Sequence, residues 1–135
     1  MKPSHIEHIG IAVPNLDEAI RYWEDVMGLK CYNIEEVVDQ KVKTAFFMIG
    51  EVKIELLEPT SPESTIAKFI ENNGGKGGMH HIAFAVENTD EALKDAEAKG
   101  IKLIDKTSRG GAEGLKIGFL HPKSTFSVLT ELCSK

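Results

Sequence analysis

The sequence predicts an α+β fold made of two tandem βαβββ modules, whose curved mixed sheets surround a cleft. Three observations carry this prediction: a strand and helix pattern that occurs twice, a glycine-rich segment between the copies, and matching polar residues in each copy. The first module is expected over about 5–73 and the second over about 78–135, within a single domain of 135 residues. A chain of this length suits one domain with its own core.

Apolar runs and turn residues place the elements of the first module. Four strands are expected, at about 8–13, 31–38, 42–48 and 52–58. Two helices are expected, at 17–27 and 61–73, because apolar residues recur there at helical spacing. Pro14 ends the first strand and Gly28 ends the first helix. The glycine-rich linker 72–78 then closes the module.

The pattern restarts after the linker. An offset of 73 residues separates His81 from His8 and Phe119 from Phe46. The last strands match at an offset of 76, between Glu55 and Glu131, so the second hairpin turn should be about three residues longer. Two copies with a period longer than that of solenoid repeats favour two modules that face each other.

Charge and composition exclude several classes of function. The net charge of −5 argues against broad nucleic-acid binding, which needs a basic face. No apolar run approaches the roughly 18 residues of a membrane span, and the first residues do not resemble a signal peptide. Cys31 and Cys133 lack the spacing of a redox or zinc motif, so a reducing cytoplasm is expected.

Each module carries a histidine at the start of its first strand and a glutamate in its last strand: His8, Glu55, His81 and Glu131. A lone histidine or glutamate in a strand is usually packed or solvated. Strand alternation, however, places apolar residues beside both glutamates, and a buried carboxylate needs a partner. Two imidazoles with two carboxylates suit one divalent ion, such as cobalt, nickel, manganese, iron or zinc. The four residues are therefore predicted metal ligands.

The chain resembles the vicinal oxygen chelate superfamily and, within it, the methylmalonyl-CoA epimerases. The resemblance rests on residues 8–14, 55–59, 64–69, 77–82 and 119–123, of which Gly-Gly-Met-His-His and His-Pro-Lys are the discriminating motifs. It implies a metal-dependent isomerase that inverts the α-carbon of an acyl-CoA through an enolate, and related folds commonly form homodimers. Glu131 is the expected catalytic base. Thr44 stands where some epimerases carry a further glutamate, which leaves the second proton carrier open.

Positive charge near the cleft would assist binding of coenzyme A. Lys43, Lys116 and Lys123 are the predicted substrate contacts, and Arg109 lies in a glycine-rich loop for which a lid over the substrate is one interpretation. The opposing interpretation is that each is a solvated surface residue.

Two other functions fit the same pattern. A glyoxalase I-type lactoylglutathione lyase would use the same ligand order and the same proton abstraction. A non-catalytic small-molecule-binding protein of the resistance type would share the fold, although such proteins commonly lack the full ligand set. An iron dioxygenase fits less well, because it normally uses two histidines and one carboxylate.

Overall fold

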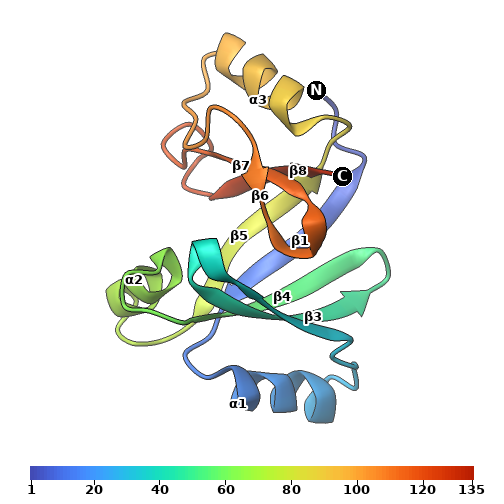
Figure 1. The fold of residues 1–135 in the computed structure, drawn as a ribbon, viewed down its shortest axis with the longest axis vertical. Helices are drawn as coiled ribbons and strands as arrows, with labels where there is room; N and C mark the ends of the chain where they lie inside the picture. Colours follow the sequence, from blue (N-terminus) through green and yellow to red (C-terminus); the bar gives the residue numbers. More distant parts are fainter. The chain divides into compact units, whose positions relative to one another are not determined.

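The computed structural model describes all 135 residues and separates them into two compact units (Figure 1). One unit comprises residues 9–80, and the other comprises residues 1–8 together with 81–135. Strands β1 (His5–Ala12) and β5 (Gly78–Ala85) supply residues to both. Each unit contains strands and helices, so the predicted α+β class is confirmed.

The unit of residues 9–80 contains three further strands, two α-helices and two short helical turns. They are α1 (Leu16–Arg21), the π turn η1 (Tyr22–Val26), β2 (Asn33–Val37), the 3-10 turn η2 (Val38–Gln40), β3 (Val42–Ile49), β4 (Val52–Pro59) and α2 (Thr65–Asn72). The strands follow the order β2-β3-β4-β1, and β3 is antiparallel to both β2 and β4. Helix α1 packs on one face, where Leu16 lies in a cluster with Ala45, Phe47 and Leu56.

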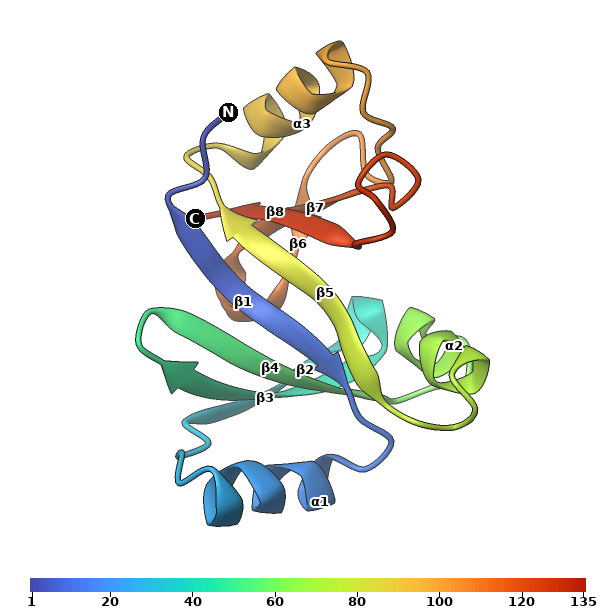
Figure 2. The ribbon, with the colours of Figure 1, turned by 180° about the vertical axis from the view of Figure 1, so that it is seen from behind.

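The unit of residues 1–8 and 81–135 contains α3 (Thr89–Ala98), β6 (Arg109–Gly110), the 3-10 turn η3 (Ala112–Gly114), β7 (Lys116–Leu120) and β8 (Thr130–Ser134). Its strand order is β1-β5-β8-β7-β6, and the parallel neighbours β5 and β8 can be followed in Figure 2. Helix α3 packs Leu93 against Leu120 and Leu132 on one face. A side chain at Gly118 would collide with Leu93, which explains a glycine inside β7.

The sequence repeat is also a structural repeat. Asn15 caps α1 and Asn88 caps α3, each accepting a hydrogen bond of 3.0 Å from the backbone N–H three residues later. Phe46 pairs with Glu55 across β3 and β4, as Phe119 pairs with Glu131 across β7 and β8. The extra residues of the second copy therefore lie in the turn, as predicted.

The second strand of the second copy is much shorter than expected. β6 has only two residues, and Leu103 adds one isolated bridge to Leu120. The physical reason is that a side chain takes the place of a backbone hydrogen bond between strands. Oδ2 of Asp105 accepts the backbone N–H of Phe119 at 2.9 Å. That amide would otherwise bond to a neighbouring strand. No helix in the chain combines the length and apolar character needed to cross a bilayer.

Candidate metal centre

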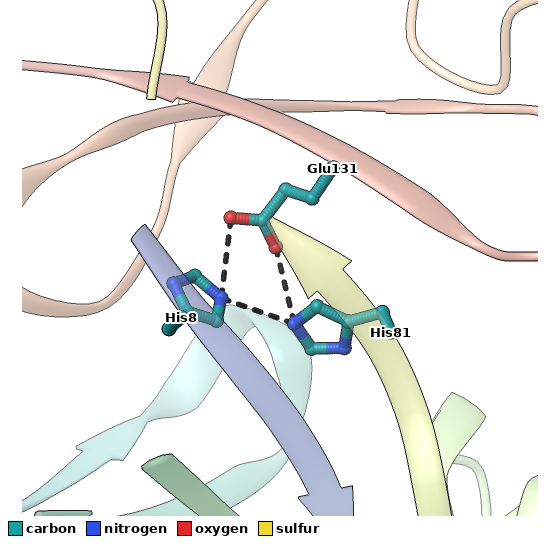
Figure 3. Close-up of side chains that lie close together, drawn as sticks. All are labelled: His8, His81 and Glu131. Atoms are coloured by element: carbon teal, nitrogen blue, oxygen red, sulfur yellow. Dashed lines mark hydrogen bonds and ion pairs between the residues drawn. The ribbon is translucent and has the colours of Figure 1, made fainter. Parts of the chain in front are cut away.

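Three strands of one unit carry His8, His81 and Glu131, whose side chains point toward one another (Figure 3). His8 lies on β1, His81 on β5 and Glu131 on β8. In the parallel register of β5 and β8, Ala83 pairs with Glu131. Residues two apart on a strand share a face, so His81 and Glu131 project from the same side of the sheet.

The three candidate ligand groups form a nearly equilateral triangle. Nε2 of His8 lies 3.1 Å from Nε2 of His81 and 3.4 Å from Oε2 of Glu131. Nε2 of His81 lies 3.3 Å from Oε1 of Glu131. Metal bonds of about 2.0–2.2 Å place neighbouring ligand atoms roughly 3.0–3.5 Å apart. The spacing of these three side chains therefore fits one divalent ion.

Burial strengthens the metal interpretation. The exposed fractions are 4% for His8, 7% for His81 and 3% for Glu131. Oε2 of Glu131 has no hydrogen-bond partner, because its 3.4 Å approach to His8 is an ion-pair distance outside hydrogen-bond geometry. Burying an unsatisfied carboxylate oxygen is unfavourable, and a cation in the triangle would offset that cost.

Glu7 contacts the opposite nitrogen of the His8 ring. Its Oε1 lies 2.6 Å from Nδ1 of His8. A carboxylate at this position keeps the ring proton on Nδ1, so Nε2 presents its lone pair to the triangle. The sequence analysis did not identify Glu7. The sequence does show a carboxylate directly before a predicted ligand. Strand alternation, however, predicts that adjacent side chains lie on opposite faces, so the pattern gave no reason to expect a contact with His8.

The candidate ligands lie on the face of the sheet that α3 does not cover. Phe119 pairs with Glu131 and so shares its face, and its ring meets the His81 ring edge to face with centroids 5.5 Å apart. Phe119 belongs to an apolar cluster with Ala83, Ile117 and Cys133. These apolar side chains lower the local dielectric, which strengthens electrostatic interactions at the ligands.

Glu55, the fourth predicted ligand, belongs to the unit of residues 9–80. It lies on β4, pairs with Phe46 and is 5% exposed, so the predicted burial of both glutamates is confirmed. The structure thus brings three of the predicted ligands together within one unit. Glu55 stays a prediction as a ligand.

The three predicted substrate lysines lie apart from this triangle or in the other unit. Lys43 is exposed on β3. Lys116 pairs with Ser134, whose hydroxyl contacts the helix α3, so alternation directs Lys116 to the helix face rather than to the face of Glu131. Lys123 is exposed in the loop after β7, where its N–H donates to Nδ1 of His121. Their roles stay predictions.

His80 is adjacent to His81 on β5 but has a different environment. Its ring packs edge to face against Phe69, with centroids 5.1 Å apart. Burial lowers the pKa of His80 to about 4, so the ring is neutral at neutral pH. His80 therefore packs against Phe69.

Comparison with known proteins identifies relatives along nearly the whole chain. The family model described as Glyoxalase/Bleomycin resistance protein/Dioxygenase superfamily matches residues 7–119. An uncharacterized protein of Bacillus subtilis, YqjC, is 42% identical over 130 residues, which make up 96% of this chain and 91% of that protein. The mitochondrial methylmalonyl-CoA epimerase of Mus musculus is 34% identical over 131 residues, 97% of this chain and 73% of that protein.

Solved structures agree with these relatives. A variant of Streptomyces coelicolor methylmalonyl-CoA epimerase, in complex with 2-nitronate-propionyl-CoA, superposes with a TM-score of 0.94 at 34% identity. The match covers 99% of this chain and 96% of that one.

Proposed function

The chain belongs to the Glyoxalase/Bleomycin resistance protein/Dioxygenase superfamily, and on that premise we propose that it is a metal-dependent epimerase of methylmalonyl-CoA. The buried triangle of His8, His81 and Glu131 is the observation that carries the proposal, because it fits the metal that this chemistry requires. Relatives named methylmalonyl-CoA epimerase, similar over 97% and 99% of the chain, support the choice of substrate.

The α-proton of methylmalonyl-CoA lies between a carboxylate and a thioester and is only moderately acidic. His8, His81 and Glu131 would hold a divalent ion, cobalt, nickel, manganese or zinc, with the two histidines as neutral imidazoles. When bound, this ion would supply Lewis acidity for the charge that develops as the α-proton leaves. Glu7 maintains the ligating tautomer of His8 by retaining the proton on Nδ1.

Glu131 removes the α-proton in this proposal. Its Oε1 lies beside Nε2 of His81 and its Oε2 beside Nε2 of His8, and the oxygen that does not hold the ion can accept the proton. General bases of this kind typically contribute about 10²–10⁴-fold to a rate. The carboxylate has two oxygens, and only one is needed as a ligand.

Inversion also requires a proton delivered to the opposite face of the carbon. Thr44, which the resemblance places where some epimerases carry a further glutamate, is 1% exposed and cannot act as a base at neutral pH. Glu55, Lys43 or a bound water is the proposed second carrier, and Glu55 is also the proposed fourth ligand.

Two further properties belong to the proposal. A reducing cytoplasmic location is proposed because the two cysteines, Cys31 and Cys133, lack the spacing of a redox or zinc motif. A homodimer is proposed because related folds commonly form one, and light scattering of the purified protein measures this directly.

One incubation with two readouts tests the function. Metal-loaded protein is incubated in D₂O with one epimer of methylmalonyl-CoA, and deuterium at the α-carbon is followed by mass spectrometry together with stereochemistry. We expect inversion of the α-carbon together with incorporation of deuterium from the solvent. The control variant Glu87→Gln changes an exposed residue in the unit that carries the candidate ligands, and it should keep this activity.

Each rival function has its own outcome. Turnover of a glutathione hemithioacetal but not of methylmalonyl-CoA would support a glyoxalase I-type lyase. Elemental analysis that finds no tightly held metal, with no activity after metal is added, would support a non-catalytic binding protein.

A further inference from the structure

Arg109 carries a guanidinium group that is held on two sides. Its Nε donates to Oδ1 of Asp105 at 3.1 Å, and its central carbon lies 5.6 Å from the centroid of the Phe119 ring. Oδ2 of Asp105 also accepts the backbone N–H of Phe119. The same carboxylate therefore contacts both Arg109 and the residue whose ring Arg109 stacks against. These contacts leave the two terminal nitrogens of the guanidinium without a partner in the chain.

Strand register places Arg109 on the face of the sheet that carries the candidate ligands. Arg109 pairs with Ile117 across β6 and β7, and paired residues share a face. Phe119 lies two residues after Ile117 and therefore shares that face, and Phe119 pairs in turn with Glu131.

The ring contacts also limit how far Arg109 lies from the triangle. The Phe119 ring that stacks with Arg109 meets the His81 ring with centroids 5.5 Å apart. A single aromatic ring therefore separates the guanidinium from a candidate ligand. In coenzyme A the phosphates are separated from the thioester by the whole pantetheine arm, so a cation this close to the ligands is near the acyl end.

We propose that the terminal nitrogens of Arg109 bind the free carboxylate of the acyl group and so select dicarboxylic acyl thioesters over monocarboxylic ones. This inference rests on the proposed function. A guanidinium presents its terminal nitrogens as a planar fork that matches the two oxygens of a carboxylate. Asp105 and Phe119 fix the orientation of that fork before a substrate arrives, which reduces the entropy lost on binding.

Surface stabilisation alone is a weak explanation of the same contacts. The Arg109 side chain is 44% exposed, and exposed ion pairs contribute little to stability. A purely structural role would also change the binding of all ligands equally, whereas carboxylate recognition affects only ligands that contain the carboxylate.

The test measures equilibrium binding of methylmalonyl-CoA, propionyl-CoA and coenzyme A by calorimetry. Methylmalonyl-CoA and propionyl-CoA differ only in the carboxylate. We expect Arg109→Met to weaken methylmalonyl-CoA binding by about 10- to 100-fold and to change propionyl-CoA binding by less than about 2-fold. Arg109→Lys keeps the charge but lacks the fork, so an intermediate loss is expected. Arg21→Lys, at the other arginine of the chain, is the matched control.

Several outcomes would overturn the inference. An equal loss for all three ligands would show that Arg109 binds the phosphates of coenzyme A or acts only structurally. Unchanged binding in both Arg109 variants, with an active wild type, would reject the role of Arg109 and leave the proposed function intact. A wild type that neither epimerises methylmalonyl-CoA nor prefers it to propionyl-CoA would reject the proposed function itself.

Discussion

The β3–β4 hairpin and the β7–β8 hairpin are two copies of one element, and they differ mainly where the chain turns. In both, a phenylalanine pairs with a buried glutamate, Phe46 with Glu55 and Phe119 with Glu131. Residues 50–51 join the first pair of strands, whereas residues 121–129 join the second. A register set by burial on one face survives a change in turn length. The position of the carboxylate is therefore independent of the loop.

The edge strands of the two copies differ in chemistry as well as length. β2 has five residues and places Glu35 opposite Thr44, whereas β6 has two and places Arg109 opposite Ile117. Counted from the paired phenylalanines, these two positions are equivalent. The repeat thus preserves the pair of phenylalanine and glutamate in both copies. At the edge strands, where packing constrains side chains least, it allows a negative charge in one copy and a positive charge in the other.

The largest expected difference between the copies is catalytic. Glu131→Gln should lower α-proton exchange by about 10³-fold or more, because the base is lost. Glu55→Gln should weaken metal binding. Recovery of the rate at saturating metal would assign Glu55 as a ligand only, whereas a rate that stays low would assign it the second proton transfer. Exchange rates and metal content measured on both variants distinguish these effects. Full activity of metal-loaded Glu131→Gln would refute its role as the base.

Packing of the helices provides the second contrast. Gly118 and Ala45 are equivalent positions that face α3 and α1. Gly118→Val would push against Leu93, which is fully buried, and should cost about 1–3 kcal/mol of unfolding free energy. Ala45→Gly removes one buried methyl group and should cost about 1 kcal/mol. Urea denaturation measures both, and a neutral Gly118→Val would contradict the close packing of α3.

Substitutions in the two turns should change the free energy of unfolding in opposite directions, because one removes a glycine and the other introduces one. Gly50 has a φ of 60°, and Ser127 has a φ of 69° in the longer loop. Gly50→Ala should destabilise by about 1 kcal/mol, because a Cβ is unfavourable in the left-handed region. Ser127→Gly should stabilise by less than about 1 kcal/mol, because relief of strain is partly offset by backbone entropy. Thermal unfolding compares the two, and the same sign for both would show that the loop does not strain Ser127.

The smallest expected effect is a pH dependence at the start of α3. Oδ1 and Oδ2 of Asp90 accept hydrogen bonds from the backbone N–H and hydroxyl of Ser108, at 2.7 and 2.9 Å. These bonds lower the pKa of Asp90 below its usual value. A lowered folded pKa adds stability above the unfolded value of about 3.9, and that stability is lost as the pH falls through the folded pKa.

Asp90→Asn should therefore be slightly less stable than wild type at pH 7, and the difference should shrink below about pH 4. Denaturation at several pH values measures this. A difference that does not change with pH would assign the effect to packing rather than to charge.

Much of the fold was predictable because its signals are periodic. The strand and helix pattern and the burial of both glutamates follow from residue spacing and repeat. The two-residue length of β6 was not predictable. Asp105 replaces a strand contact there, and no local pattern signals that its carboxylate reaches Phe119.

By itself, the sequence determined the duplicated βαβββ order and the histidine and glutamate positions from which a metal centre is inferred. Only the tertiary structure decided that Nε2 of His8, Nε2 of His81 and the carboxylate of Glu131 converge, that Glu7 orients His8, and that Arg109 stacks on Phe119. The reason is physical: periodicity assigns a side chain to a face, but distances between residues far apart in the chain depend on how strands pair and twist.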